Sequence, residues 1–275
     1  MMKGYYTEPK ERGVSESIGF LLIFTIVIAG IGLVTLYGYP MLLQQQVSAD
    51  EKIMEKNMIV LQNDIKSLAY KTVPYKETSL KIGGGSLTVY APSYISPSKL
   101  STLEISYDGT PYLSFQPGEL RYESISAQTD ISLENGAVIL RPRNQGSNSG
   151  SVMLAEPRWF YDKPTNMMVI SLINITSDNL IAKEGIGTVR MKLGKTVYPD
   201  TLPAANVITL VYKPGTGQDY SVAWDNYIMK MNTPDIKVTR SGTPGTGTAL
   251  TYTFTPSIAP TKLAIKQYEV KIESL

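Results

Sequence analysis

The hydrophobic and polar positions divide the chain into stretches of different pattern. From Ser17 through Ala49 there is no charged residue, and the 20 residues from Ile18 to Tyr37 are predominantly apolar. A helix rises about 1.5 Å per residue, so a run of this length crosses a hydrocarbon core of roughly 30 Å. The pattern predicts a helix that lies in lipid, in a lipid-like protein core, or in one and then the other.

The next stretch has the period of an amphipathic helix. Apolar residues recur there at intervals of four and three residues, at Met54, Met58, Leu61, Ile65 and Leu68. This spacing forms a seam on one helical face, and charged residues lie mostly off it. We expect the helix to continue to about Lys71 and to end at Val73, because a residue before proline disfavours the α conformation. The seam packs either on the C-terminal domain or on a neighbouring subunit.

Pro40 lies between these two stretches. Proline lacks an N–H group and clashes with the preceding turn, so it kinks or breaks a helix at a cost of ~3 kcal/mol or more. Tyr37 and Tyr39 beside it are placed like an interfacial aromatic belt. The position therefore fits the outer boundary of a membrane, a hinge at which the helix loosens during assembly, or both.

From about Thr78 the pattern predicts strands. Asp108-Gly109 and Asn135-Gly136 favour type I′ turns and mark two hairpins. Ser79–Ala91 reads as two short strands around Gly83, Gly84 and Gly85. Further strands are expected at Ser151–Ala155, Met167–Thr176, Thr188–Leu193, Val207–Tyr212, Ile236–Arg240, Leu250–Thr255 and Lys262–Ile272. A short helix is expected over Ser221–Met231, with Ser221 as its cap.

Short strands with regular turn signals predict a β-sandwich. The expected fold class is α+β, with a long N-terminal hydrophobic helix followed by a predominantly antiparallel β-sandwich head. The expected parts are a leader at 1–13, the helix with its amphipathic extension at 14–73, and a β-rich head at 78–275.

The composition excludes several kinds of catalytic and metal-binding site. The chain has no Cys and no His, which removes disulfides, thiolate catalysis, the commonest metal ligand and every Ser-His triad. A net charge of +2, with no basic block, gives no case for nucleic acid. We expect no catalytic residues, no metal and no cofactor. A surface enzyme on a signal anchor is the weakest of the alternatives.

The residues before the apolar run set an orientation. Lys3, Lys10 and Arg12 flank it, and positive charge beside a first span keeps that end cytoplasmic. The run is too long for the apolar region of a secretory signal peptide, and no small-x-small cleavage site follows it. We therefore expect a single-pass protein with a cytoplasmic N-terminus and an extracellular C-terminal domain.

Arg12-Gly13, followed by Val14-Ser15-Glu16-Ser17-Ile18-Gly19 and the apolar helix, resembles the class III signal peptide of archaeal type IV pilin-like proteins, archaellins included. The resemblance covers roughly residues 10–45. It implies that a prepilin peptidase cuts after Gly13 and leaves Val14 as the new N-terminus. It also implies that the helix is first a membrane anchor and then the core of a filament.

The implied partners are further copies of the chain in a helical homopolymer, the prepilin peptidase, the pilus assembly machinery and, before assembly, the membrane. The expected function is a structural subunit of a pilus-like filament, an adhesive or other surface appendage. The alternative is a minor pilin or a non-polymerising surface protein held by the same anchor.

Several residues are candidates for assembly. They are Glu16, Gly19, Ile26, Ile28, Ala29, Gly30, Gly32 and Pro40. Glu16 either pairs with a neighbour's α-amino group or is a first-turn carboxylate favoured by the helix dipole. The small residues either form a contact patch or reflect the general frequency of glycine in membrane helices. Asn174 begins an N-x-[ST] sequon and is a candidate for glycosylation.

Overall fold

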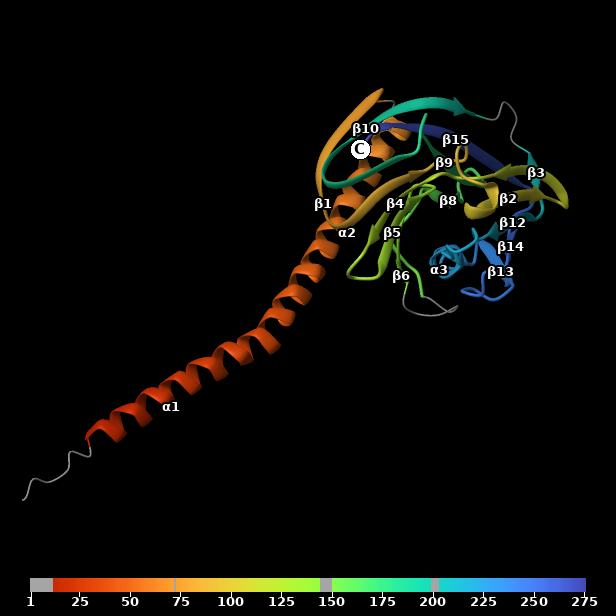
Figure 1. Cartoon of the computed structure of the whole chain (residues 1–275). Coiled ribbons are helices and arrows are strands. Elements are labelled where there is room, and N and C mark those ends of the chain that lie inside the picture. The colour runs from red at the N-terminus through yellow and green to blue at the C-terminus, as the bar shows by residue number, and fades with distance from the viewer. Residues whose placement is uncertain (1–11, 72, 144–149, 199–202) are drawn as a thin grey trace, which may run out of the picture. The chain divides into compact units, whose positions relative to one another are not determined.

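The computed structural model describes residues 12–71, 73–143, 150–198 and 203–275. It confirms the α+β class, with helix first and a β-rich domain after it (Figure 1). The chain divides at Ala49 into two compact units, an apolar helical unit and a unit from Asp50 to Leu275 that we call the head. Residues 1–11, which hold most of the expected leader, lie outside the described residues.

The first unit is helical throughout its described residues. Helix α1 spans Arg12–Leu33, a π-helical turn spans Val34–Gly38, and α2 runs from Tyr39 to Lys71. The π turn comes directly before Pro40, and the Tyr39 N–H donates to the Val34 carbonyl five residues back. The wider turn makes room for a proline ring that would clash with the carbonyl four residues earlier. The helix therefore continues through Pro40 instead of breaking there.

The second half of α2 belongs to the head. All five seam residues from Met54 to Leu68 are fully buried. They form one hydrophobic cluster with side chains of the ten-stranded sheet, such as Leu87, Ile131 and Val270. Of the two expected packing partners, the seam therefore takes the C-terminal domain of its own chain.

The head contains two sheets. The ten-stranded sheet has the order β7-β6-β5-β4-β1-β10-β15-β9-β8, with β11 paired to β15, and the five-stranded sheet has the order β13-β14-β12-β2-β3. Among these named strands only β9 and β15 pair in parallel. The strands of the larger sheet are β1 Tyr75–Tyr90, β4 Glu119–Ser124, β5 Thr129–Glu134, β6 Ala137–Pro142, β7 Val152–Ala155, β8 Trp159–Asp162, β9 Met167–Thr176, β10 Ile181–Val197, β11 Ala204–Ala205 and β15 Thr261–Ser274. The smaller sheet holds β2 Thr102–Tyr107, β3 Thr110–Phe115, β12 Ile208–Lys213, β13 Ile236–Ser241 and β14 Leu250–Pro256.

Both faces of the ten-stranded sheet are covered. One face packs on α2, and the other packs on the five-stranded sheet and on the short helix α3, Ser221–Met229. Successive side chains of a strand point to opposite faces of the sheet, so one strand contributes to both clusters. On β9, Leu172 lies in the cluster with α3 and Ile173 lies in the cluster with α2. The head is thus a sandwich of two sheets with a helix as a third layer.

The two expected hairpins are present. Asp108 and Gly109 have φ of 44° and 78°, and Asn135 and Gly136 have φ of 49° and 75°. Both dipeptides therefore hold the left-handed conformation that a type I′ turn requires, and each joins two paired strands.

The expectation of two strands around Gly83–Gly85 is wrong. β1 is one continuous strand whose register with β10 shifts between Ile82 and Ser86. Gly84 has φ of 64°, and a Cβ on Gly83 would lie 2.6 Å from the Asp50 carboxyl carbon. The glycines form a bulge that bends the strand and lets it pass close to α2, so the chain does not reverse there.

The expected cap of α3 is also wrong. Tyr220 is the N-cap and makes no side-chain cap hydrogen bond, while the Ser221 N–H donates to Asp219 Oδ1 at 2.8 Å. The buried Ser221 hydroxyl instead accepts from the Gly245 N–H at 2.8 Å. Ser221 therefore ties a loop to the helix, and the carboxylate of Asp219 satisfies the helix start.

Candidate functional site

The uncharged helical segment, residues 17–49, is the first candidate site. By length and composition, the helix that contains it is long and apolar enough to cross a membrane. Its apolar side chains are exposed in the single chain; Ile26 is 62% and Ile28 is 52% exposed. The hydroxyls of Thr25 and Thr35 donate to carbonyls four residues back, at 2.8 and 2.9 Å. Internal pairing of this kind lets a hydroxyl enter an apolar surrounding at low cost.

The small residues of this segment are open for contact. At Gly19, Gly30 and Gly32 an added Cβ would meet no other atom within 4 Å. Ala29 lies next to Gly30 on the same exposed helix, and Glu16 is exposed in the second turn of α1. The backbone at these glycines is therefore accessible to a second helix, which is the geometry that small residues provide in membranes.

Helix α1 begins with the expected processing residues. Arg12, Gly13 and Val14 fall in its first turn, and their side chains lie outside the described residues. Processing after Gly13 therefore stays a prediction.

Asn174 lies within β9, in the parallel ladder with β15. Its side chain is half-buried, and its Oδ1 accepts from the Gly118 N–H at 3.1 Å. The hydroxyl of Thr176, the third residue of the sequon, is buried. A transferase would have to reach this asparagine before the sheet closes, so glycosylation at Asn174 stays a prediction.

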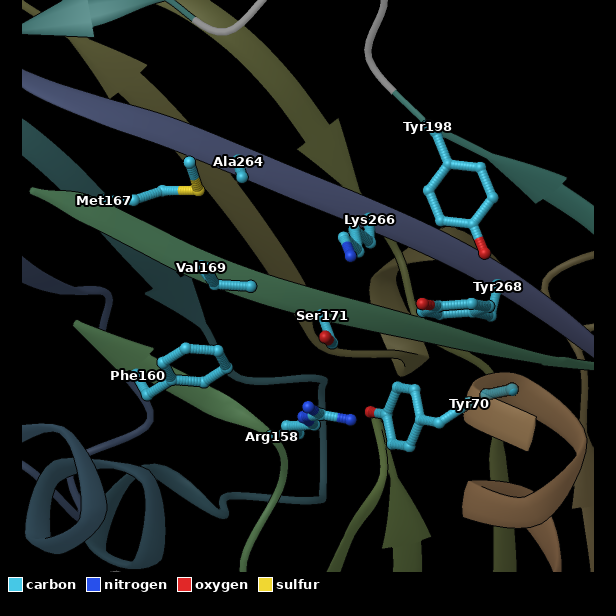
Figure 2. A pocket seen from close by; sticks show the side chains of 11 residues that line it. Tyr70, Arg158, Phe160, Met167, Val169, Ser171, Tyr198, Ala264, Lys266 and Tyr268 are labelled. Carbon is cyan, nitrogen blue, oxygen red and sulfur yellow. The ribbon is translucent and has the colours of Figure 1, made fainter. Parts of the chain in front are cut away.

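A second candidate site lies in the head, where β8, β9 and β15 pass the end of α2. A pocket there has a volume of about 260 Å³, and we call it the cation–tyrosine pocket; its lining side chains are drawn in Figure 2. Its lining residues are Ala69, Tyr70, Arg158, Phe160, Met167, Val169, Ser171, Tyr198, Ala264, Lys266 and Tyr268. Two of them are cations and none is a carboxylate.

Aromatic rings hold the two cations of this pocket. The Arg158 guanidinium lies 5.0 Å from the Tyr70 ring centre, and the Lys266 ammonium lies 5.8 Å from the Tyr198 ring centre. Tyr268 meets both tyrosine rings edge to face, at 5.4 and 6.0 Å between ring centres. A cation over a ring keeps its N–H donors available, so both groups can still bind an anion.

The sheet interface carries buried charges of a different kind. Glu119, Arg121 and Glu123 alternate with apolar residues along β4, and Arg121 pairs with both carboxylates. On β5, Glu134 is 2% exposed and its Oε1 accepts from Trp224 Nε1 at 3.1 Å. Burial raises the pKa of Glu134 to about 7, against the opposing effect of that hydrogen bond. The carboxyl therefore lies inside the sandwich and joins β5 to α3 through Trp224.

Sequence reasoning did not find the cation–tyrosine pocket. Its polar residues come from α2, the residue before β8, β9, the residue after β10, and β15. These residues are adjacent only because of the order of the strands in the sheet. No spacing within a single segment therefore predicts the pocket. Among the described residues, no group of three or more Asp or Glu side chains is placed to hold a metal ion.

The fold and the uncharged segment define a class of protein in which one N-terminal helix of membrane-spanning length leads into a β-rich domain. The chain belongs to the Family of unknown function (DUF7289), which matches residues 12–273. The match covers the apolar helix and the head together. No curated protein and no solved structure matches the chain.

Proposed function

We propose that this protein is a structural subunit of an archaeal type IV pilus-like surface filament, released from its leader by cleavage after Gly13. The observation that carries the proposal is the helical segment 17–49, which has no charge, begins four residues after Gly13 and exposes its apolar side chains. A helix of this kind needs an apolar surrounding, first lipid and then other copies of itself.

Assembly in this proposal exchanges lipid contacts for helix contacts. Lipid tails are as apolar as leucine, so no hydrophobic gain drives the exchange, and close packing must supply the stability. The open backbone at Gly19, Gly30 and Gly32 permits such close approach. The head, fixed to the end of the same helix by its buried seam, then forms the outer layer of the filament.

A second candidate is a minor pilin or a non-polymerising surface protein with the same anchor. The size of the β-rich part, residues 75–275, favours it, because a large head limits how closely heads can pack. Fractionation separates the two: a protein present in membranes and absent from sheared filaments supports the second candidate.

The proposal is tested by placing a charge in the segment. Ile26→Lys and Ile28→Lys should abolish filaments, because an unpaired ammonium in a helix core is strongly unfavourable. Ile125→Lys is the matched control, since Ile125 is an exposed isoleucine of the head. Electron microscopy of sheared surface material gives the readout. Abundant regular filaments from either helix variant would count against a bundled core.

A further inference from the structure

The cation–tyrosine pocket of the head has no place in filament assembly as described above. We propose that it binds a carboxylate-bearing sugar residue, a hexuronate, of an acidic polysaccharide. This inference does not rest on the proposed filament function, because every residue of the pocket lies in the head.

The charge of the pocket points to an anion. Arg158 and Lys266 are exposed, and neither forms an ion pair with any carboxylate in the described part of the chain. The guanidinium lies within 6 Å of two rings, those of Tyr70 and Phe160. It is therefore held in place while its fork of donors remains free for a carboxylate.

Neutral donors converge on the same space. Figure 2 shows the polar ends of Tyr70, Arg158 and Ser171 turned toward one another. Burial raises the pKa of the Tyr70 hydroxyl, and burial followed by the hydrogen bond with Tyr198 raises that of Tyr268. The Tyr70 hydroxyl therefore stays protonated at neutral pH and can donate to a ligand oxygen, whereas the Tyr268 hydroxyl is engaged with Tyr198.

The walls point to a ring and not to a bare anion. Val169 and Ala264 are buried apolar residues of the floor, and Phe160 and Tyr198 expose aromatic surface at the rim. A sulfate or phosphate ion would leave this surface in contact with nothing. A pyranose presents C–H groups to aromatic and apolar walls and hydroxyls to polar donors, which is the mixed lining typical of small-ligand pockets.

The size of the pocket points to one residue of a longer chain. Pockets for drug-sized ligands have volumes of roughly 300–1,000 Å³. At about 260 Å³ this pocket lies just below that range, so it suits a single sugar ring and not an extended peptide. Two cations are too few to track a nucleic acid backbone.

The test is isothermal titration calorimetry of the full-length protein in detergent with trigalacturonate. Maltotriose, hexaglutamate and sodium sulfate are the comparison ligands. We expect trigalacturonate to bind and the other three to bind at least about tenfold more weakly, because each lacks either the carboxylate or the ring.

Variants locate the binding. Lys266→Gln and Arg158→Gln should each weaken binding about tenfold, since each removes a charge-assisted hydrogen bond. Tyr198→Ala should weaken it about threefold or more by removing a ring wall. The matched controls are Lys237→Gln and Tyr94→Ala, an exposed cation and an exposed tyrosine outside the pocket. Thermal melting confirms that each variant is folded.

The proposal is overturned by three results. The first is no heat from trigalacturonate at millimolar concentration. The second is equal binding of hexaglutamate or sulfate, which would make the pocket a general anion or peptide site. The third is unchanged binding in folded Lys266→Gln and Tyr198→Ala protein, which would place the sugar elsewhere. All of these outcomes are independent of whether filaments form.

Discussion

Glu134 is a buried residue whose acidity depends strongly on its surroundings. It is an acid within the sandwich, hydrogen-bonded to Trp224, and burial raises its pKa to about 7. The unfolded chain, with a pKa near 4.5, gives up this proton at lower pH than the folded chain does. The free energy of unfolding therefore falls as the pH rises from about 4.5 to about 7.

Glu134→Gln should remove this pH dependence. The difference between a pKa of 4.5 and one of about 7 corresponds to about 3 kcal/mol that the wild type loses across the window. The amide keeps an acceptor for Trp224 and carries no proton to lose. We expect the free energy of unfolding of the variant, relative to that of the wild type, to be higher at pH 8 than at pH 5. Denaturant unfolding curves at the two pH values measure this difference.

Glu184→Gln, at an exposed position of β10, is the control for the same series and should follow the wild type. If Glu134→Gln retained the full slope of the wild type between pH 5 and pH 8, another group would have to carry the titration.

At the scale of elements, the bulge of β1 depends on glycine. A Cβ on Gly85 would overlap the carbonyl oxygen of Glu123 on the neighbouring strand β4. We expect Gly85→Ala to lower the free energy of unfolding by about 1–3 kcal/mol, because backbone cannot move aside as a side chain can. Gly150→Ala, where an added Cβ meets nothing within 4 Å, should lie within about 0.5 kcal/mol of wild type. Equal effects of the two variants in urea unfolding would contradict this account of the bulge.

The seam of α2 gives a second prediction at this scale. Leu61 is fully buried against the ten-stranded sheet, while Val60 beside it is 47% exposed. Leu61→Ala should cost about 2–5 kcal/mol, through lost burial and the cavity it leaves. Val60→Ala should cost less, because about half of the Val60 side chain is already exposed to solvent. Chemical denaturation of both variants measures the difference, and a small cost for Leu61→Ala would mean that the seam does not hold the helix to the sheet.

The sequence predicts best those elements whose geometry is determined by neighbouring residues. The four-three spacing from Met54 to Leu68 and the dipeptides Asp108-Gly109 and Asn135-Gly136 carry their geometry within a few residues. β4 was not predicted: Glu119 and Arg121 are buried there as a pair, and the charges of the segment do not indicate such burial. The glycines of β1 signalled a turn, but contacts with α2 and β4, distant in sequence, make them a bulge.

At the scale of the whole molecule, one of the two candidate sites can be predicted from the sequence and the other cannot. The uncharged segment is contiguous, so its length and lack of charge mark it without a structure. The cation–tyrosine pocket joins residues as distant as Tyr70 and Tyr268, which only the sheet order brings together. The proposed use of the segment as a filament core can therefore be tested on the intact chain.

The measurement that tests this claim most directly is peptide mass spectrometry of sheared cell-surface material. The account predicts a mature terminus at Val14 in a filament fraction, with the head peptides present in equal amount. Recovery of the chain only in membranes, with residues 1–13 still attached, would contradict the account and leave a signal-anchored surface domain.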